Sequence, residues 1–322
     1  MEEEYGSRRD LYLILFLNWG TGPFGTRTRF IGSNMETKQK KIINHKFLNK
    51  HTILGAILLM LWGLIFTEMI FGLPFVILDT IFVDQSGKTQ LFSGFGCAAG
   101  AFLLLAIHKR WFYPEFEGCL KCSSVSFADA FKPAAAIIPF WILSCIKELA
   151  FGSKFSVPTL AMISTSLMAG CCEEASFRGL GISYLMRQWK EENKVLPALL
   201  FTSAGFGLVH SANILSGAEV PITLIQTFSS FFIGLFLGAI FLRSGNLWPA
   251  MIIHFLHDVF AGMFLPEGYV LTHAVGWIDA VDLALCLLLG IAGIYLIRPE
   301  KRAEIIEIWK RKWSMDQNFT KK

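Results

Sequence analysis

Charged residues are scarce in this chain: Asp, Glu, Lys and Arg make up 17% of its 322 residues, whereas apolar residues make up 53%. Soluble domains carry roughly 25% charged residues, so this deficit argues against a soluble globular protein. The net charge is only +4, and the basic residues gather in loops between apolar runs. Because no basic face of the kind that binds nucleic acid results, we expect a membrane protein without a nucleic-acid partner.

Sequence signatures of disulfide scaffolds and of common hydrolases are also missing. The seven cysteines are an odd number and lie mostly inside apolar runs, where a free thiol packs as a small hydrophobe. Cys119 and Cys122 form a single CxxC without a second pair, which is a weak metal or redox signal. The chain has no HExxH zinc motif, no GxSxG nucleophile motif and no internal repeat. The sequence therefore predicts one membrane domain.

Long apolar runs provide the fold prediction. A bilayer core of about 30 Å requires a helix of about 20 apolar residues. The sequence contains enough such runs to predict an all-α, polytopic membrane protein with about eight transmembrane helices. They are expected at 53–72, 90–108, 133–151, 157–186, 196–213, 221–242, 246–266 and 278–297.

Basic residues are distributed unevenly among the loops. Lys and Arg are frequent in 1–51, 109–132, 187–194 and 298–322, and rare in the loops between these segments. Since loops rich in Lys and Arg stay on the cytoplasmic side, both termini are predicted to be cytoplasmic.

The same pattern predicts three regions. They are a basic N-terminal tail (1–51), a transmembrane domain (52–298) with a motif-bearing core at 155–265, and a basic amphipathic C-terminal tail (299–322). In the C-terminal tail, Ile305, Ile306, Trp309 and Trp313 share one helical face. This pattern is typical of a helix that lies in the membrane interface.

Three ionisable side chains interrupt the apolar run at 157–186. Charges at membrane depth are costly and usually mark a functional interior. Glu174 and Arg178 are four residues apart on one helical face and can pair. Glu173 is turned about 100° away, so the arginine need not neutralise it and one carboxylate is left for another purpose. A structural ion pair between helices explains this segment equally well.

Two later spans contribute histidines. His210 ends the fifth predicted span, and His254 shares one helical face with Asp258 in the seventh. A single histidine can be a hydrogen-bonded tie between helices, which is our interpretation of His257. For Glu173, His210 and His254 together, three helices each supply a costly polar group, which favours a shared site. We assign no chemistry to the remaining acidic residues of the spans, which are Glu68, Asp79, Asp279 and Asp282.

A carboxylate and two imidazoles are suited to hydrolysis. A carboxylate in a low-dielectric site is a competent general base. Imidazoles can bind a divalent metal such as zinc, with His210, His254 and Glu173 as its ligands, or can orient a water without any cofactor. Water activated in either way attacks a carbonyl, which predicts peptide hydrolysis. A proton relay of the kind found in transporters could use the same residues.

The ordered motifs Glu173-Glu174-x-x-x-Arg178, Phe206-x-x-x-His210 and His254-x-x-x-Asp258 resemble those of a known family. It is the CAAX-protease and bacteriocin-processing (CPBP) family of intramembrane proteases, also called the Abi family. The resemblance covers about 155–265 and implies an all-helical core with a cavity that opens toward the cytoplasm.

The resemblance also implies roles for the six residues. Glu173 would activate the attacking water together with His210, and Glu174 and Arg178 would hold the geometry. His254 and Asp258 would stabilise the oxyanion. Many family members have Asn where this chain has Asp258. An ionised Asp only accepts hydrogen bonds, so it could instead orient His254 or bind a metal.

Two functions compete at this point. The first is an intramembrane endopeptidase. The alternative is a non-catalytic membrane protein, such as a bacteriocin self-immunity factor or an adaptor, that keeps the fold. The expected partners are the lipid bilayer and a peptide or protein substrate with a membrane-proximal or lipidated end. A prenylated CAAX protein, a double-glycine bacteriocin precursor and a membrane regulator all fit this description.

Overall fold

The computed structural model describes residues 46–83, 90–264 and 274–314. The chain divides into two units, Met1–Gln39 and Lys40–Lys322. The first unit lies outside the described residues, as do most of the predicted tail at 1–51 and residues 315–322 of the predicted C-terminal tail. Within the described residues the second unit consists of helices and contains no β-strand, which confirms the all-α prediction.

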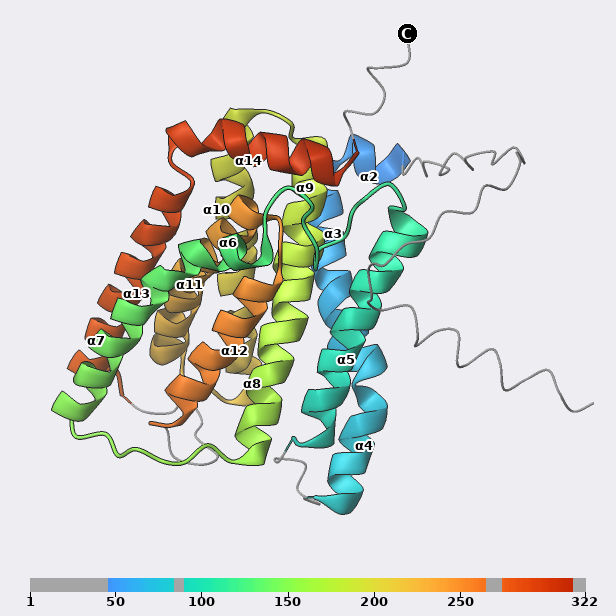
Figure 1. Ribbon diagram of the computed structural model, residues 1–322. Helices are drawn as coiled ribbons and strands as arrows, with labels where there is room; N and C mark the ends of the chain where they lie inside the picture. Colours follow the sequence, from blue (N-terminus) through green and yellow to red (C-terminus); the bar gives the residue numbers. More distant parts are fainter. Residues whose placement is uncertain (1–45, 84–89, 265–273, 315–322) are drawn as a thin grey trace, which may run out of the picture. The chain divides into compact units, whose positions relative to one another are not determined.

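Figure 1 shows how the helices of the second unit follow one another along the chain. They are α2 (Lys46–Lys50), α3 (Thr52–Leu64), η1 (Ile65–Phe71), α4 (Leu73–Phe82), α5 (Phe92–Ile107), η2 (His108–Phe112), α6 (Phe127–Phe131), η3 (Lys132–Ala136), α7 (Ile137–Ala150), α8 (Leu160–Glu173), η4 (Glu174–Ile182), α9 (Ser183–Gln188), η5 (Glu192–Lys194), α10 (Val195–Val209), η6 (His210–Ser216), α11 (Val220–Ser244), α12 (Trp248–Gly262), α13 (Trp277–Leu296) and α14 (Pro299–Lys312).

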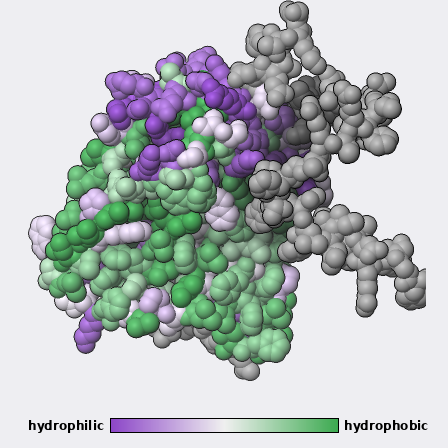
Figure 2. Space-filling model, in the orientation of Figure 1, coloured by the Kyte–Doolittle hydropathy of each residue, from purple (hydrophilic) through white to green (hydrophobic). Residues whose placement is uncertain are grey.

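Among the described residues, six helical segments are long and apolar enough to cross a membrane. They are Thr52–Phe82, Phe92–Phe112, Phe127–Ala150, Glu192–Ser216, Val220–Ser244 and Trp277–Leu296. Figure 2 shows apolar residues over the side of the helical bundle and hydrophilic residues gathered at the end that carries α14. We conclude that this is an integral membrane protein, because a bilayer is the solvent that such a surface requires.

Two of the eight predicted spans are helical but do not meet the same criterion. The span predicted at 157–186 corresponds to α8, η4 and α9, which include Glu173, Glu174 and Arg178. The span predicted at 246–266 corresponds to α12, which has only 15 residues. The count of eight is therefore approximate, because the segments that carry the motifs are interrupted by polar side chains or are short.

The motif-bearing helices lie in the middle of the bundle (Figure 1). Helix α8 packs along α5 on one side and α12 on the other, and η4 packs against α3 and α10. Helix α11 packs between α10 and α13, and α13 also contacts α7. The polar side chains of η4 and α12 are thereby enclosed by apolar helices.

Glycines allow the first span to approach η4 closely. A methyl group on Gly63 would lie 2.5 Å from Ser176 Oγ, and one on Gly55 would lie 2.6 Å from Tyr184 Oη. Such small residues are common where helices meet in membranes, because association there depends on van der Waals packing. The two contacts are eight residues apart along both segments but in opposite directions. The first span and the α8–η4–α9 segment therefore run antiparallel in a fixed register.

Three of the described segments, η1, η2 and η4, wind as π-helices, which are rare and frequently found at functional sites. Every residue of η4 is buried, including Glu174 and Arg178. The π-helical segment η4 therefore contains the buried charged residues Glu174 and Arg178.

Asp79 holds the end of the first span to the start of the second. Its carboxylate accepts hydrogen bonds from the backbone N–H groups of Leu91, Phe92 and Ser93, at 2.6–2.9 Å, and from Ser93 Oγ at 2.6 Å. These N–H groups belong to the beginning of α5 and have no partner within the helix. Asp79, to which the sequence assigned no chemistry, is therefore an interhelical tie.

The apolar face predicted for the C-terminal tail is present in α14, but it packs on the protein. Trp309 and Trp313 are only 1% and 3% exposed, and Trp313 stacks on Phe116 with 4.2 Å between ring centroids. The expectation that this face lies in the membrane interface is therefore wrong for these side chains. Helix α11 covers Trp309, whose Nε1 donates to the Leu242 carbonyl at 3.1 Å, and the loop before α6 covers Trp313.

The loop at 113–122 connects α14 with the motif-bearing helices. The buried Lys312 Nζ donates hydrogen bonds to the carbonyls of Gly118 and Lys121, both at 2.6 Å. In the same loop, the Cys119 carbonyl accepts from Leu247 N just before α12, at 2.9 Å. Burial raises the pKa of the Cys119 thiol to about 11, so the thiol stays protonated and donates to the Gly179 carbonyl in η4 at 3.3 Å.

Candidate active site

The predicted ion pair between Glu174 and Arg178 is present and fully buried. Arg178 Nη1 lies 2.8 Å from Glu174 Oε1, and the two side chains are 1% and 0% exposed. The arginine also donates to the Gly234 carbonyl of α11 at 3.2 Å, and its guanidinium lies 4.3 Å from the centre of the Phe206 ring. Each of these contacts holds η4 against α10 or α11, so the pair fixes the position of the first motif.

His254 joins the third motif to the first. Its Nδ1 lies 2.9 Å from Glu174 Oε1, the oxygen that also accepts from Arg178. The side chain is 5% exposed, and the Phe206 ring packs edge-on against it at 5.7 Å. The imidazole is thus held by a carboxylate on one nitrogen, and only Nε2 remains for other contacts.

Two more carboxylates approach that nitrogen. Glu173 Oε2 and Asp258 Oδ2 each lie 3.6 Å from His254 Nε2, beyond ordinary hydrogen-bond distance. Glu173 Oε2 is buried and has no hydrogen-bond partner among the described residues. The side chains of Glu173 and Asp258 are 19% and 32% exposed, so this part of the site is less enclosed than the Glu174–Arg178 pair.

His210 lies at the start of η6, directly after α10. Its Nδ1 is 2.9 Å from the Phe206 carbonyl, which can only accept, so the ring nitrogen donates. Phe206 packs edge-on against His210 as well as His254, with centroids 5.1 Å apart for His210. His210 also interacts electrostatically with Asp258. All three motifs therefore meet around the ring of Phe206.

A metal site is not assembled by these side chains. Within residues 46–83, 90–264 and 274–314, no three His, Cys, Asp or Glu side chains are grouped so that they could hold a metal ion. The set of His210, His254 and Glu173 that the sequence offered as zinc ligands therefore does not fit a metal in this arrangement.

The interhelical hydrogen bond predicted for His257 is not made by its Nδ1 among the described residues, and it stays a prediction for Nε2. Its ring packs against Phe140 of α7 at 5.6 Å, and its Nδ1 is buried without a hydrogen-bond partner in the described part of the chain. The contact of His257 with α7 is thus a contact between the His257 and Phe140 rings, and Nδ1 makes no hydrogen bond there.

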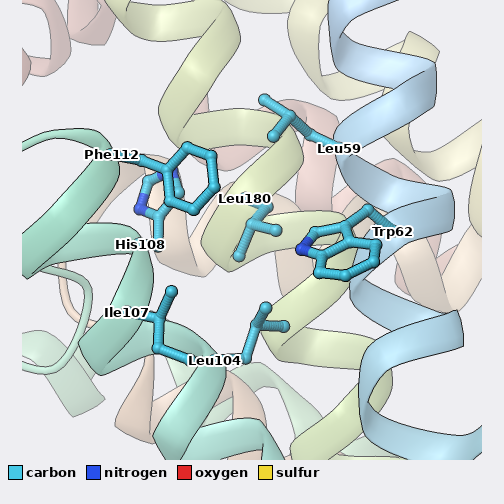
Figure 3. A pocket seen from close by; sticks show the side chains of 7 residues that line it. All are labelled: Leu59, Trp62, Leu104, Ile107, His108, Phe112 and Leu180. Carbon is cyan, nitrogen blue, oxygen red and sulfur yellow. The ribbon is translucent and has the colours of Figure 1, made fainter. Parts of the chain in front are cut away.

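A hollow lies elsewhere, between α3 on one side and α5 and η2 on the other. Figure 3 shows Trp62 on one side of it and Phe112 on the other, with Leu180 of η4 between them. None of the six predicted site residues lines this hollow. We therefore place the candidate site around His254 and not in the hollow.

Sequence reasoning missed two groups at the site. Phe206 was noted only as part of a motif, although its ring contacts both histidines and the guanidinium. The four-residue spacing from Phe206 to His210 was the available signal. The Gly234 carbonyl could not be found from sequence, because every residue has a backbone acceptor.

Comparison with known proteins identifies a family to which the motif-bearing core is similar. Residues 155–260 match the family described as type II CAAX prenyl endopeptidase Rce1-like. The motif-bearing core is Rce1-like. This match confirms the resemblance to the CPBP proteases and supports an endopeptidase. No curated protein and no solved structure matches the chain.

The Rce1-like core extends from the residues before α8 to α12 and contains all six predicted site residues. Helices α3, α5, α7, α13 and α14 lie outside it. These outer helices supply much of the apolar surface around the core.

Proposed function

We propose that this protein is an intramembrane endopeptidase in which Glu173 and His210 activate water for attack on a peptide carbonyl. The observation that carries this proposal is the state of Glu173. Its Oε2 is buried and unpartnered beside His254 among the described residues, while the neighbouring Glu174 is committed to Arg178 and His254. The match to an endopeptidase family supports the same reaction class.

The hydrogen bond of His210 Nδ1 leaves the second ring nitrogen available to hold the attacking water. Since Nδ1 donates to the Phe206 carbonyl, the neutral ring keeps a lone pair on Nε2 that can accept a hydrogen bond from water. Glu173 takes one proton from that water, and the oxygen forms a bond to the carbonyl carbon of the substrate. The carbonyl π-electrons move to its oxygen, which becomes a negatively charged oxyanion.

His254 is placed to stabilise that oxyanion. Its Nδ1 donates to Glu174, so donation from Nε2 requires the doubly protonated imidazolium. The carboxylates of Glu173 and Asp258 near Nε2 favour this cation. In this proposal Asp258 acts on His254 and not on the oxyanion directly. When the C–N bond breaks, the proton on Glu173 passes to the leaving amine, and the carboxylate is restored.

The proposed setting is a cell membrane with both termini of the protein in the cytoplasm. Support comes from the distribution of Lys and Arg, which are frequent in the loops at 109–132 and 187–194 and in 298–322. The proposed substrate is a protein or peptide with a membrane-proximal or lipidated end, because the site lies among helices that cross the bilayer.

The test is Glu173→Gln in proteoliposomes with a membrane-anchored peptide substrate. Gln keeps the size and hydrogen-bonding capacity of the side chain but cannot take a proton from water, so we expect turnover to fall about 10²–10⁴-fold. Wild-type thermal stability should be retained, since Glu173 Oε2 makes no hydrogen bond among the described residues that Gln would lose.

Near-wild-type cleavage by Glu173→Gln would refute the proposed mechanism. Loss of wild-type activity on chelation, with recovery by zinc, would replace it with a metal-dependent one. If the wild-type protein cleaves nothing and Glu173→Gln keeps full immunity or adaptor function, the non-catalytic alternative is correct.

A further inference from the structure

Glu68 is an exposed carboxylate at the centre of a membrane span. It lies in η1, sixteen residues from the start and fourteen from the end of the segment Thr52–Phe82. The side chain is exposed, and within the described ranges it has no ion-pair or hydrogen-bond partner. A charged group facing hydrocarbon at this depth is costly, and such residues usually face a polar cavity or a substrate path.

The packing of the first span brings Glu68 to the level of Glu173. Gly63 lies against Ser176, and the first span runs antiparallel to η4 and α8. Moving from Gly63 to Glu68 therefore corresponds to moving from Ser176 back toward Glu173. The two carboxylates are close enough to interact electrostatically. Glu68 is thus the acidic residue of the first span that is nearest to the proposed chemistry.

The small cluster of Met60, Phe177 and Phe206 places Glu68 on the same side as His210. Leu64 of α3 and Val209 of α10 both pack against this cluster. Glu68 follows Leu64 by about one helical turn, and His210 follows Val209 directly. The two polar residues therefore extend past the cluster in the same direction, on either side of Glu173.

Three accessible side chains in this region are acidic. Glu173 and Asp258 are partly exposed, and Glu68 is exposed. The guanidinium of Arg178 is buried and already paired with Glu174. The proposed imidazolium of His254 is buried and faces Glu173 and Asp258, so neither cation is paired with Glu68. A cationic group is the partner that such a surface attracts.

We propose that Glu68 lines the entrance to the Glu173 site from the membrane and binds a positively charged side chain of the substrate near the cleaved bond. This subsite rests on the proposed endopeptidase function. It adds a preference for basic residues that none of the three motifs provides. Glu68 contacts substrate in this scheme but takes no part in proton transfer.

The first experiment does not depend on protease activity. Proteoliposomes of the full chain are treated with a water-soluble carbodiimide or with hydrophobic dicyclohexylcarbodiimide, and labelled carboxylates are located by mass spectrometry. If the entrance is filled with water, the water-soluble reagent should label Glu68. The matched control is Met69→Glu, because Met69 is the next residue and is 67% exposed. Its new carboxylate should react only with the hydrophobic reagent.

The second experiment measures specificity. Each residue within three positions of the cleaved bond of a membrane-anchored peptide is replaced in turn by lysine or by uncharged norleucine. At one position, kcat/KM of the wild-type protein should favour lysine by about tenfold, which corresponds to about 1.4 kcal/mol. In Glu68→Gln, the ratio of kcat/KM for the lysine peptide to kcat/KM for the norleucine peptide should fall about tenfold, to a value near one.

The outcomes separate the two proposals. If Glu68 reacts only with the hydrophobic reagent, as Met69→Glu does, it faces lipid and the entrance is refuted whatever the activity. An unchanged lysine preference in Glu68→Gln refutes the cationic subsite. Absence of any cleavage by the wild-type protein refutes the endopeptidase function and, with it, the cationic subsite. Labelling by the water-soluble reagent would then support only a water-filled entrance, without a role in substrate binding.

Discussion

Replacing Arg178 by alanine should damage the fold more than any other single change at the site. The variant leaves the Glu174 carboxylate, which is 0% exposed, without the cation 2.8 Å from its Oε1. Removing one partner of a buried ion pair typically costs about 3–5 kcal/mol. The lost hydrogen bond to the Gly234 carbonyl and the lost contact with Phe206 act in the same direction.

A double-mutant cycle tests this reasoning in detergent-solubilised protein. Arg178→Met keeps much of the packing volume but removes the charge, and Glu174→Gln removes the charge of its partner. The double variant should be more stable than Arg178→Met alone, because it no longer contains an unpaired buried carboxylate. We expect a coupling energy on the order of 2 kcal/mol, as is found for contacting residues in one network. The free energy of unfolding of the four proteins is the measurement.

Additive effects of Arg178→Met and Glu174→Gln would refute the pair as a source of stability. Wild-type stability of Arg178→Ala together with lost cleavage would place Arg178 in the chemistry instead. Glu174→Gln also weakens the hydrogen bond to His254, so cleavage should fall in that variant even if its stability is kept.

Two further predictions concern packing. Gly63→Val should destabilise the protein by about 1–3 kcal/mol, because the first added carbon would lie 2.5 Å from Ser176 Oγ. Gly205→Ala is the matched control, since its nearest neighbour would be 3.5 Å away; equal thermal shifts in the two variants would contradict the close approach. Lys312→Met should cost about 1–3 kcal/mol, because the buried Gly118 carbonyl and the partly buried Lys121 carbonyl lose their donor. Lys310→Met, at an exposed position of the same helix, should have little effect on the melting temperature. An equal loss of stability in the two variants would show that the hydrogen bonds of Lys312 do not stabilise the fold.

The parts of the structure that follow simple periodicity could be predicted. Apolar runs of membrane length gave six helices that meet the membrane criterion. The four-residue spacing of Glu174 and Arg178 was enough to predict their ion pair, because such residues share a helical face. His254 and Asp258 lie on one face for the same reason, although their polar atoms remain 3.6 Å apart.

Contacts between distant segments could not be predicted. The sequence places Glu174 and His254 eighty residues apart, and nothing in it indicates that His254 would bind Glu174 more closely than Glu173. The π-helical winding that begins at Glu174 changes which side chains face each neighbour, and no residue pattern announces it. The burial of Trp309 could not be predicted either, because an apolar helical face can pack on protein as well as on lipid.

The contacts of Lys312 have a consequence for the order of synthesis. The loop at 113–122 is made early, whereas Lys312 in α14 is among the last described residues to leave the ribosome. Until then the carbonyls of Gly118 and Lys121 lack their donor, and the loop that contacts Leu247 and Gly179 is not secured. We therefore expect a nascent chain stalled before Pro299 to hold its motif-bearing helices loosely. Limited proteolysis of chains stalled before and after α14 would reveal it, and equal resistance would contradict it. A protease built in this way would stay inactive until α14 has been made and has packed on the loop at 113–122.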